Sequence, residues 1–400
     1  MHLIQRTIML VVESLGVGEL PDSEQYNSLG CNTLGHCSEN LKKLNIPNLS
    51  RLGLGNLTFM KQAERSADTL GFYGKLRQQS DGIDPMLGHW EICGNKNESL
   101  FYTDAKGFFP EIITKLTKKT GYTFITDLDT TTPPLPALIV HNHKESKEPI
   151  IYYDDNYALY IVVHPEVMEH EQFIKLCEDA REICDYYGIV RLNGVRSERL
   201  SGESYKKEHV KQYLTPPMSH SILSSLNSSG IPVYTIGNVT DYIHDEAIHK
   251  KIETNDDEET LKSLMDLLDK SKSEDKEYFV YASLKGPIES VKIEDSTLSD
   301  YAASLEYFDS QLPNIYRSMN TSDLLIITSS HAKDPTYSKI GNTREYLPIL
   351  IYSRILNVRT RGNLGVRRTL CDIAETISDI YSLDTHYGGD SFWNYMISRI

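Results

Sequence analysis

The chain has 400 residues, of which 40% are hydrophobic and 24% charged, and its formal net charge is −15. These values are typical of a soluble globular protein with room for two domains. The acidic balance argues against nucleic acid or an anionic membrane as a partner, because both repel a negatively charged surface. No apolar run approaches 18 residues, so we expect no membrane span, and we interpret the apolar N-terminus as a strand rather than a signal peptide.

The cysteine pattern indicates reduced thiols in a cytoplasmic protein. Six cysteines are scattered along the chain without a C-x-x-C pair, so a thiolate zinc site is not expected. Cys31 and Cys37 are close enough in sequence to leave a disulfide open, although a cytoplasmic location favours two free thiols.

Apolar strands alternate with amphipathic helices near both ends of the chain. We predict strands at 6–13, 231–237, 277–284, 323–331 and 346–353, and helices at 32–44, 48–52, 299–312 and 366–381. This order predicts an α/β fold with a mostly parallel sheet covered by helices on both faces. Ligands bind off the carboxyl ends of the strands in such sheets, which points to Glu13, Ser330 and His331.

The middle of the chain differs in composition. It is richer in polar and aromatic residues, with short predicted strands at 149–153, 158–164 and 188–193 and an amphipathic helix at 169–187. We therefore predict an inserted α+β domain at 101–215, between core segments 1–100 and 216–400.

Residues 80–91 read SDGIDPMLGHWE and show no helical or strand period, which is typical of an active-site loop. Its centre carries Pro85, followed by Met86 and Leu87, where a hydroxyl or thiol nucleophile is expected. Asp84 and His89 remain as polar candidates for a cleft.

Several stretches resemble signatures of the phosphopentomutases, enzymes of the alkaline phosphatase superfamily. They occur in the family's order and cover nearly the whole chain: VVESLGVGELPD (11–22), NTLGH (32–36), PNLSRLGLGN (47–56), GHWE (88–91), DPT (334–336), TREYLPILIY (343–352), LGVRRTLCDIAETI (364–377) and GDSF (389–392). The resemblance implies an alkaline-phosphatase-like core with an inserted cap. It also implies interconversion of ribose 1-phosphate and ribose 5-phosphate by two Mn²⁺ ions and a phosphorylated threonine.

The resemblance further implies that the reactive positions are changed. The threonine position falls on Pro85, which has no hydroxyl. The six metal-ligand positions fall on Glu13, Glu289, Glu294, Ser330, His331 and Asn342. His331 alone keeps the family's residue type. In the cap, the family's aspartate falls on Asn156, and its basic run falls on 206–213, where Lys206, Lys207 and Lys211 keep some positive charge.

These positions favour a catalytically inactive homologue without a cofactor, kept for a binding, regulatory or structural role. Its ligand would be a sugar phosphate, a nucleotide or a protein partner. One alternative is a repurposed phosphomutase or phosphoesterase, because Glu13, Glu289, Glu294 and Asn342 offer oxygen ligands for Mn²⁺, Mg²⁺ or Ca²⁺. Another is an accessory subunit of an active partner. The retained side chains also have a plainer interpretation: His331 as a hydrogen-bonded cleft residue, and His89 with Trp90 as packing.

Overall fold

The computed structural model describes residues 2–398 except 64, 97–108, 127–134, 154–157, 188, 199, 201–209, 215–219, 244, 275, 287–297, 338–340 and 357–361. The chain divides into two compact units. Unit 1 comprises Met1–Asn97 and Pro217–Ile400, and unit 2 comprises Glu98–Pro216.

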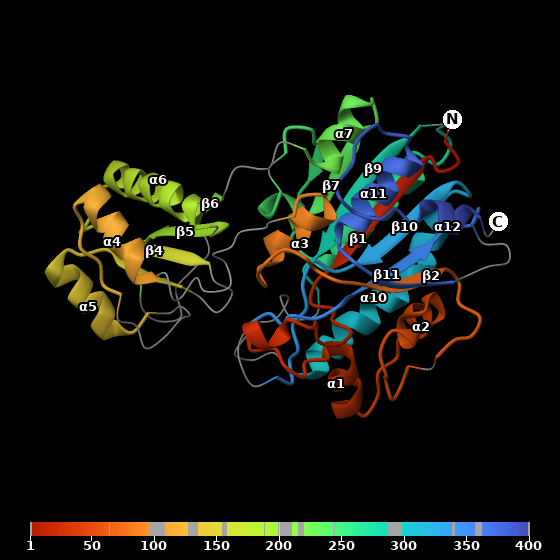
Figure 1. The fold of residues 1–400 in the computed structure, drawn as a ribbon, viewed down its shortest axis with the longest axis horizontal. Helices are drawn as coiled ribbons and strands as arrows, with labels where there is room; N and C mark the ends of the chain where they lie inside the picture. The colour runs from red at the N-terminus through yellow and green to blue at the C-terminus, as the bar shows by residue number, and fades with distance from the viewer. Residues whose placement is uncertain are drawn as a thin grey trace. The chain divides into compact units, whose positions relative to one another are not determined.

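Unit 1 is built on an eight-stranded sheet with the order β12-β2-β11-β10-β1-β9-β7-β8 (Figure 1). The strands are β1 (Arg6–Val12), β2 (Phe72–Leu76), β7 (Val233–Gly237), β8 (Lys250–Ile252), β9 (Tyr278–Leu284), β10 (Asp323–Thr328), β11 (Leu347–Tyr352) and β12 (Asn363–Arg367). β11 runs antiparallel to both of its neighbours, and the other pairs are parallel. The prediction of a mostly parallel α/β sheet is therefore confirmed.

Helices cover the sheet, as expected from the central strands β1, β9 and β10, which are buried along their whole length. They are α1 (Thr33–Asn40), α2 (Pro47–Leu52), α3 (Pro85–Ile92), α7 (Ile222–Ser228), α8 (Asp257–Lys270), α10 (Leu298–Ser318), α11 (Cys371–Ile380) and α12 (Trp393–Ile397). On β1, Ile8, Leu10 and Val12 belong to one hydrophobic cluster with residues of α1, α2, α8 and α10. Because strand side chains alternate, the other residues of β1 point to the opposite face.

Two predictions from the sequence are wrong in unit 1. The predicted helix 366–381 begins only at Cys371 as α11, because β12 before it pairs with β2. The run 85–92 is not part of a loop but forms α3, which starts with the Asp84 side chain accepting a hydrogen bond from the Met86 amide. Pro85 follows at the first helical position, where its fixed φ and missing N–H cost nothing. All eight residues of α3 are buried, so the helix shows no amphipathic period.

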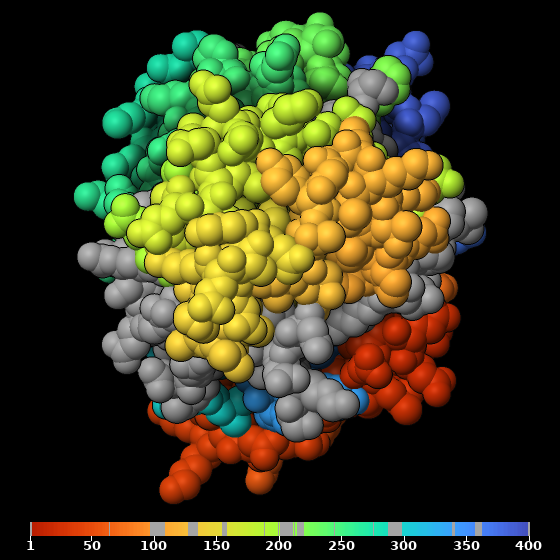
Figure 2. All heavy atoms as spheres, turned by 90° about the vertical axis from the view of Figure 1, so that its left-hand side faces the viewer, coloured from red at the N-terminus to blue at the C-terminus, as the bar shows by residue number. Residues whose placement is uncertain are grey.

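Unit 2 contains a four-stranded sheet with the order β3-β4-β5-β6. Its strands are β3 (Ile150–Tyr153), β4 (Leu159–Val163), β5 (Arg191–Arg196) and β6 (Val210–Leu214), and its helices are α4 (Phe109–Thr120), α5 (Ala137–Ser146) and α6 (His170–Tyr186). Helices α4 and α6 lie side by side, orange and yellow-green in Figure 2. Both contribute to one hydrophobic cluster with β3, β4 and β5, which gives this unit its own core.

Two properties of the described residues bear on the sequence analysis. None of their helices is long and apolar enough to cross a membrane. All six cysteines, including Cys31 and Cys37, are buried and free.

A buried ion pair fastens the amino-terminal ends of the central strands. The guanidinium of Arg6, on β1, donates two hydrogen bonds to the carboxylate of Asp323, on β10. Its remaining nitrogen donates to the Leu268 carbonyl and to the hydroxyls of Ser271 and Tyr278. Both charges are almost completely buried, so each depends on the other for its solvation.

We expect Asp323→Asn to lower the free energy of unfolding by about 3 kcal/mol, because the Arg6 charge would remain buried without a counter-ion. Urea unfolding followed by circular dichroism measures the change. Lys276→Gln is the matched control, since its pair with Glu274 is exposed and solvent-screened. Equal stability of the two variants would contradict this role of the pair.

Candidate functional site

Glu13 is the centre of a buried polar network at the carboxyl ends of the central strands. It follows the last residue of β1 and is 0% exposed. Its Oε1 lies 2.7 Å from His89 Nε2 and 3.4 Å from the Ser283 hydroxyl. Its Oε2 accepts a 2.5 Å hydrogen bond from the Ser330 hydroxyl and lies 3.0 Å from His331 Nδ1. One carboxylate thus joins β1 to α3, to the end of β9 and to the loop after β10.

The network stabilises the ionised form of Glu13. Burial by itself would raise the pKa of this carboxyl, but the charges and hydrogen bonds of His89 and His331 outweigh burial and hold the pKa well below its usual range. A carboxylate is acceptor-only, so the protons of these contacts belong to its partners. Glu13 is therefore a fixed negative charge inside unit 1.

His89 connects Glu13 to a tyrosine that sequence reasoning missed. Its Nδ1 lies 2.6 Å from the Tyr281 hydroxyl, and its ring stacks on Tyr242 at a centroid distance of 4.4 Å. Val280 and Ala282 belong to the cluster on the other face of the sheet, so Tyr281 points toward α3. The alternation of side chains between the two faces of strand 277–284 predicts that Tyr281 and Val280 point to opposite faces. It does not show which helix covers which face.

His331 connects Glu13 to Ser14, a second residue that the sequence did not single out. His331 Nε2 lies 3.3 Å from the Ser14 hydroxyl, and both side chains are buried. Ser14 has φ of 67°, a left-handed backbone conformation that non-glycine residues rarely adopt. The chain turns sharply there because β1 ends just before it.

Two buried charges hold the loop that leads into α3. Arg344 donates to the carbonyls of Ser80 and Gly82, both at 2.8 Å, and forms an ion pair with Asp22. Glu91 accepts hydrogen bonds from the amides of residues 79 and 80 and from Thr369 and Leu370. The loop is thus held through its backbone, independently of any reactive side chain.

Gly88 allows α3 to approach the end of β10. A Cβ built at this position would lie 1.8 Å from the Ser330 carbonyl oxygen, a distance that no side chain can occupy. This close approach places His89 against Glu13. Gly88 is therefore explained by packing.

The remaining predicted site residues are placed as follows. Asp84 caps α3, Pro85 is its first residue, and the Asn342 side-chain amide donates to the Ile83 carbonyl at 2.9 Å. Lys211 belongs to unit 2, where its Nζ lies 4.9 Å from the ring centroid of Tyr213. Five further positions named from the sequence lie outside the described residues: Asn156, Lys206, Lys207, Glu289 and Glu294.

The described residues at the Glu13 edge do not fit a manganese centre. Both oxygens of Glu13 already accept hydrogen bonds, and Ser330 offers a hydroxyl that donates to Glu13. In the described part of the chain, these side chains do not form a group of three converging ligand atoms. A Mn²⁺ site needs several carboxylate or imidazole donors with free lone pairs.

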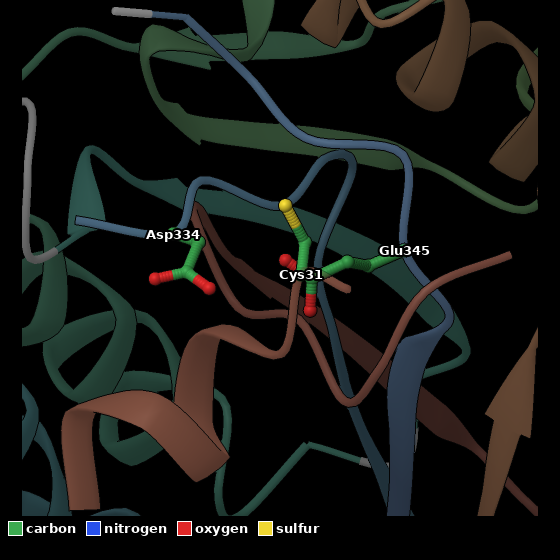
Figure 3. A group of neighbouring side chains, drawn as sticks. All are labelled: Cys31, Asp334 and Glu345. Carbon is green, nitrogen blue, oxygen red and sulfur yellow. The ribbon is translucent and has the colours of Figure 1, made fainter. Parts of the chain in front are cut away.

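A different group, formed by Cys31, Asp334 and Glu345, does bring three ligand-type atoms within 4.8 Å of one another (Figure 3). Each carboxylate there is already used. Asp334 accepts from the Asn32 and Thr336 amides and Glu345 from the Gly18 and Thr33 amides, each with further side-chain partners.

The thiol of this group is not a ready metal ligand. Burial, together with the nearby Glu345 and Asp334 carboxylates, raises the pKa of Cys31 far above its usual range, so the thiol keeps its proton. Metal binding requires the thiolate. We interpret the three residues as a structural junction between the loop before α1 and the loop before β11.

Comparison with known proteins assigns the family. The family model of the Metalloenzyme superfamily matches residues 5–385. The chain belongs to this superfamily. It is 31% identical over 391 residues to the phosphopentomutase of Caldanaerobacter subterraneus subsp. tengcongensis, covering 98% of both proteins. It is 29% identical to the phosphopentomutase of Alkaliphilus oremlandii, covering 99% of this chain and 100% of that protein.

The fold of this superfamily member also has a relative among solved structures. Leishmania mexicana phosphoglycerate mutase superposes with a TM-score of 0.52 at 10% identity, and 97% of each chain is covered. This similarity concerns the fold. The full-length similarity in sequence makes the protein phosphopentomutase-like.

We expect Glu13→Gln to lower the free energy of unfolding by about 3 kcal/mol, because an amide cannot accept all the hydrogen bonds now made to the carboxylate. The pKa of Glu13 lies below that of an unfolded glutamate, about 4.3, so its contribution is present above that pH and lost as the pH falls below it. Urea unfolding at pH 7 and at pH 4 should therefore show a smaller difference at pH 4. The exposed Glu24→Gln is the control, and an equal effect of both substitutions would refute the role of Glu13.

Arg344→Met should loosen the loop before α3, because the carbonyls of Ser80 and Gly82 would lose their donors inside the protein. We expect a loss of about 2–3 kcal/mol and faster hydrogen exchange at amides 79–86. Hydrogen exchange followed by mass spectrometry measures the rates peptide by peptide. Arg51→Met, at an exposed position, should leave them unchanged, and unchanged rates in Arg344→Met would show that the loop is held by other contacts.

Proposed function

We propose that this phosphopentomutase-like protein does not interconvert ribose 1-phosphate and ribose 5-phosphate, and that it serves a binding, regulatory or structural role. The observation that carries the proposal is the state of Glu13. Its carboxylate is enclosed by hydrogen-bond donors from His89, Ser330 and His331. A metal-dependent mutase would need that carboxylate, and the Ser330 position, as ligands.

The first residue of α3 supports the same proposal. The family's phosphorylated threonine is expected at the position of Pro85, which opens α3 without a hydroxyl. A phosphoenzyme cannot form at a proline, because there is no oxygen to accept the phosphoryl group. The surrounding loop is held by Arg344 and Glu91. An ordered loop at this position is therefore no evidence for phosphopentomutase activity.

The ligand is expected to be a phosphorylated sugar or a nucleotide, by analogy with the relatives named phosphopentomutase. This analogy supports a class of ligand, but it does not indicate which residues of this chain would contact the ligand. The alternative binding partner is another protein, for example an active enzyme to which this chain binds as an accessory subunit. A repurposed phosphoesterase with an altered cation is the competing enzyme, and it would depend on Glu289 and Glu294.

The purified protein is expected to show no conversion of ribose 1-phosphate to ribose 5-phosphate with Mn²⁺, and no stoichiometric Mn²⁺ by plasma mass spectrometry. The phosphopentomutase of Caldanaerobacter subterraneus serves as the positive control. Pro85→Thr should stay inactive, because a hydroxyl alone does not restore the metal ligands. Turnover together with bound Mn²⁺ would overturn the proposal, and a bound cation with phosphoesterase turnover would favour the repurposed enzyme.

Thermal melting then separates the binding roles. A ligand that prefers the folded state raises the melting temperature as its concentration passes its Kd. We expect a rise with one member of a panel of pentose phosphates and nucleotides. Unchanged melting across the panel would contradict the small-ligand role and favour a protein partner.

A further inference from the structure

Helix α5 covers one face of the four-stranded sheet of unit 2 and is held there by few side chains. On β3, Ile151 belongs to the cluster shared with α4 and α6, whereas Ile150 belongs to a second cluster that includes residues of α5. Since strand side chains alternate, α5 lies on the face opposite to α4 and α6. Of the ten residues of α5, all of which the structure describes, only His143 is buried. Ile139 and Val140 pack against the second cluster but remain partly exposed.

The imidazole of His143 is hydrogen-bonded to the backbone on two sides. Its Nδ1 lies 2.6 Å from the Glu148 carbonyl oxygen, which can only accept, so Nδ1 carries a proton. Its Nε2 accepts a 2.8 Å hydrogen bond from the His164 amide, so Nε2 carries none. The two contacts require a neutral imidazole, because both nitrogens of an imidazolium are donors. In this form the ring joins the last turn of α5 to the segment before β3 and to the end of β4.

His164 has a similar environment. Its Nδ1 accepts a 3.2 Å hydrogen bond from the Glu166 amide, so this ring is also neutral in the structure. Both rings are buried, His143 at 0% and His164 at 4% exposure. Burial is the largest effect on both groups, and it lowers the pKa of each histidine.

The surroundings offer no buried counter-ion for an added proton. The charged residues that face the two rings come from α5 and its carboxyl end, from the segment before β3, and from the loops after β4 and β5: Lys144, Lys147, Glu148, Glu166 and Glu198. The two lysines lower the pKa of His143 further. None of the three glutamates is buried. Glu166, whose carboxylate lies 3.7 Å from His164 Nδ1, is exposed and pairs with Lys144.

We propose that α5 is an acid-released helix: neutral His143 docks it on the sheet of unit 2, and protonation of His143 releases it and uncovers the apolar face beneath. That face includes Ile150, Tyr152, Val162 and Val195. A protonated Nε2 would point its hydrogen at the His164 amide, so the ring cannot keep both contacts. This inference concerns the interior of unit 2 alone and is independent of the proposed function.

The direction of the response follows from the pKa of His143. In the released helix the pKa would be that of an ordinary histidine, about 6.5, and in the docked helix burial makes it lower. Docking is therefore strongest above about pH 6.5 and weakens as the pH falls below that value, because only the released form binds the proton.

The test is hydrogen exchange of the full chain at pH 7.5 and at pH 5.5, followed by mass spectrometry and corrected for the intrinsic exchange rate at each pH. At pH 5.5, which lies above the ordinary pKa values of carboxyl groups, we expect the protection of the α5 amides to fall by about tenfold. The amides of α6, which packs on the other face, should keep their protection. Equal protection of α5 at both pH values in the wild type overturns the proposal. An equal loss in α6 also overturns it, because the whole unit would then be opening.

Variants on the same helix assign the response to one ring. His143→Gln is neutral at both pH values, so the protection of its α5 should not change with pH, whether the amide docks the helix or leaves it released. His141→Gln is the matched control, because the His141 side chain is 65% exposed, and it should respond like the wild type. Circular dichroism shows whether each variant is folded. A full tenfold response in folded His143→Gln would refute the assignment to His143.

Discussion

The buried carboxylate of Glu13 is the constraint on which the candidate site depends. A charge removed from water must recover its solvation from fixed donors, and here the donors come from α3, from β9 and from the loop after β10. Each donor is thereby fixed in turn: His89 by Tyr281, and His331 by Ser14. Among the described residues, the geometry of this edge is therefore organised around one negative charge.

The loop before α3, which positions His89 next to Glu13, is held by two further buried charges. Arg344 satisfies the carbonyls of the loop before α3, and Glu91 satisfies its amides. These contacts involve the backbone, so they do not depend on the side chain at position 85. For this reason the loop is held in place with a proline at the start of α3. Removing either charge would disturb the loop whether or not the protein is an enzyme.

The central strands were predictable from the sequence because burial on both faces leaves continuous apolar runs, as in 6–13 and 323–331, whereas the outer strands β2, β8 and β12 were not predicted. The helix α3 was not, because a helix buried all round has no polar face and its glycine and histidine suggest a loop. The predicted helix 366–381 started too early and included the end of β12, because the pairing of β12 with β2 comes from a segment far away in the chain. In the site, Glu13, His89 and His331 were found from strand ends and motifs. Tyr281 and Ser14 were missed, since only the packing of α3 and the turn after β1 reveal their roles.

Packing explains several residues of the family's framework in this molecule. Gly88 is required by the approach of α3 to Ser330, Arg344 and Glu91 by the loop backbone, and Glu345 by the amides of Gly18 and Thr33. These four residues therefore have packing reasons that do not depend on catalysis, and a 31% identity with a phosphopentomutase carries the fold more firmly than the reaction. What the edge can do must follow from the groups that surround Glu13. Among the described residues there, His89, Ser330 and His331 contact the carboxylate directly, and Tyr281 and Ser14 contact the two imidazoles in turn.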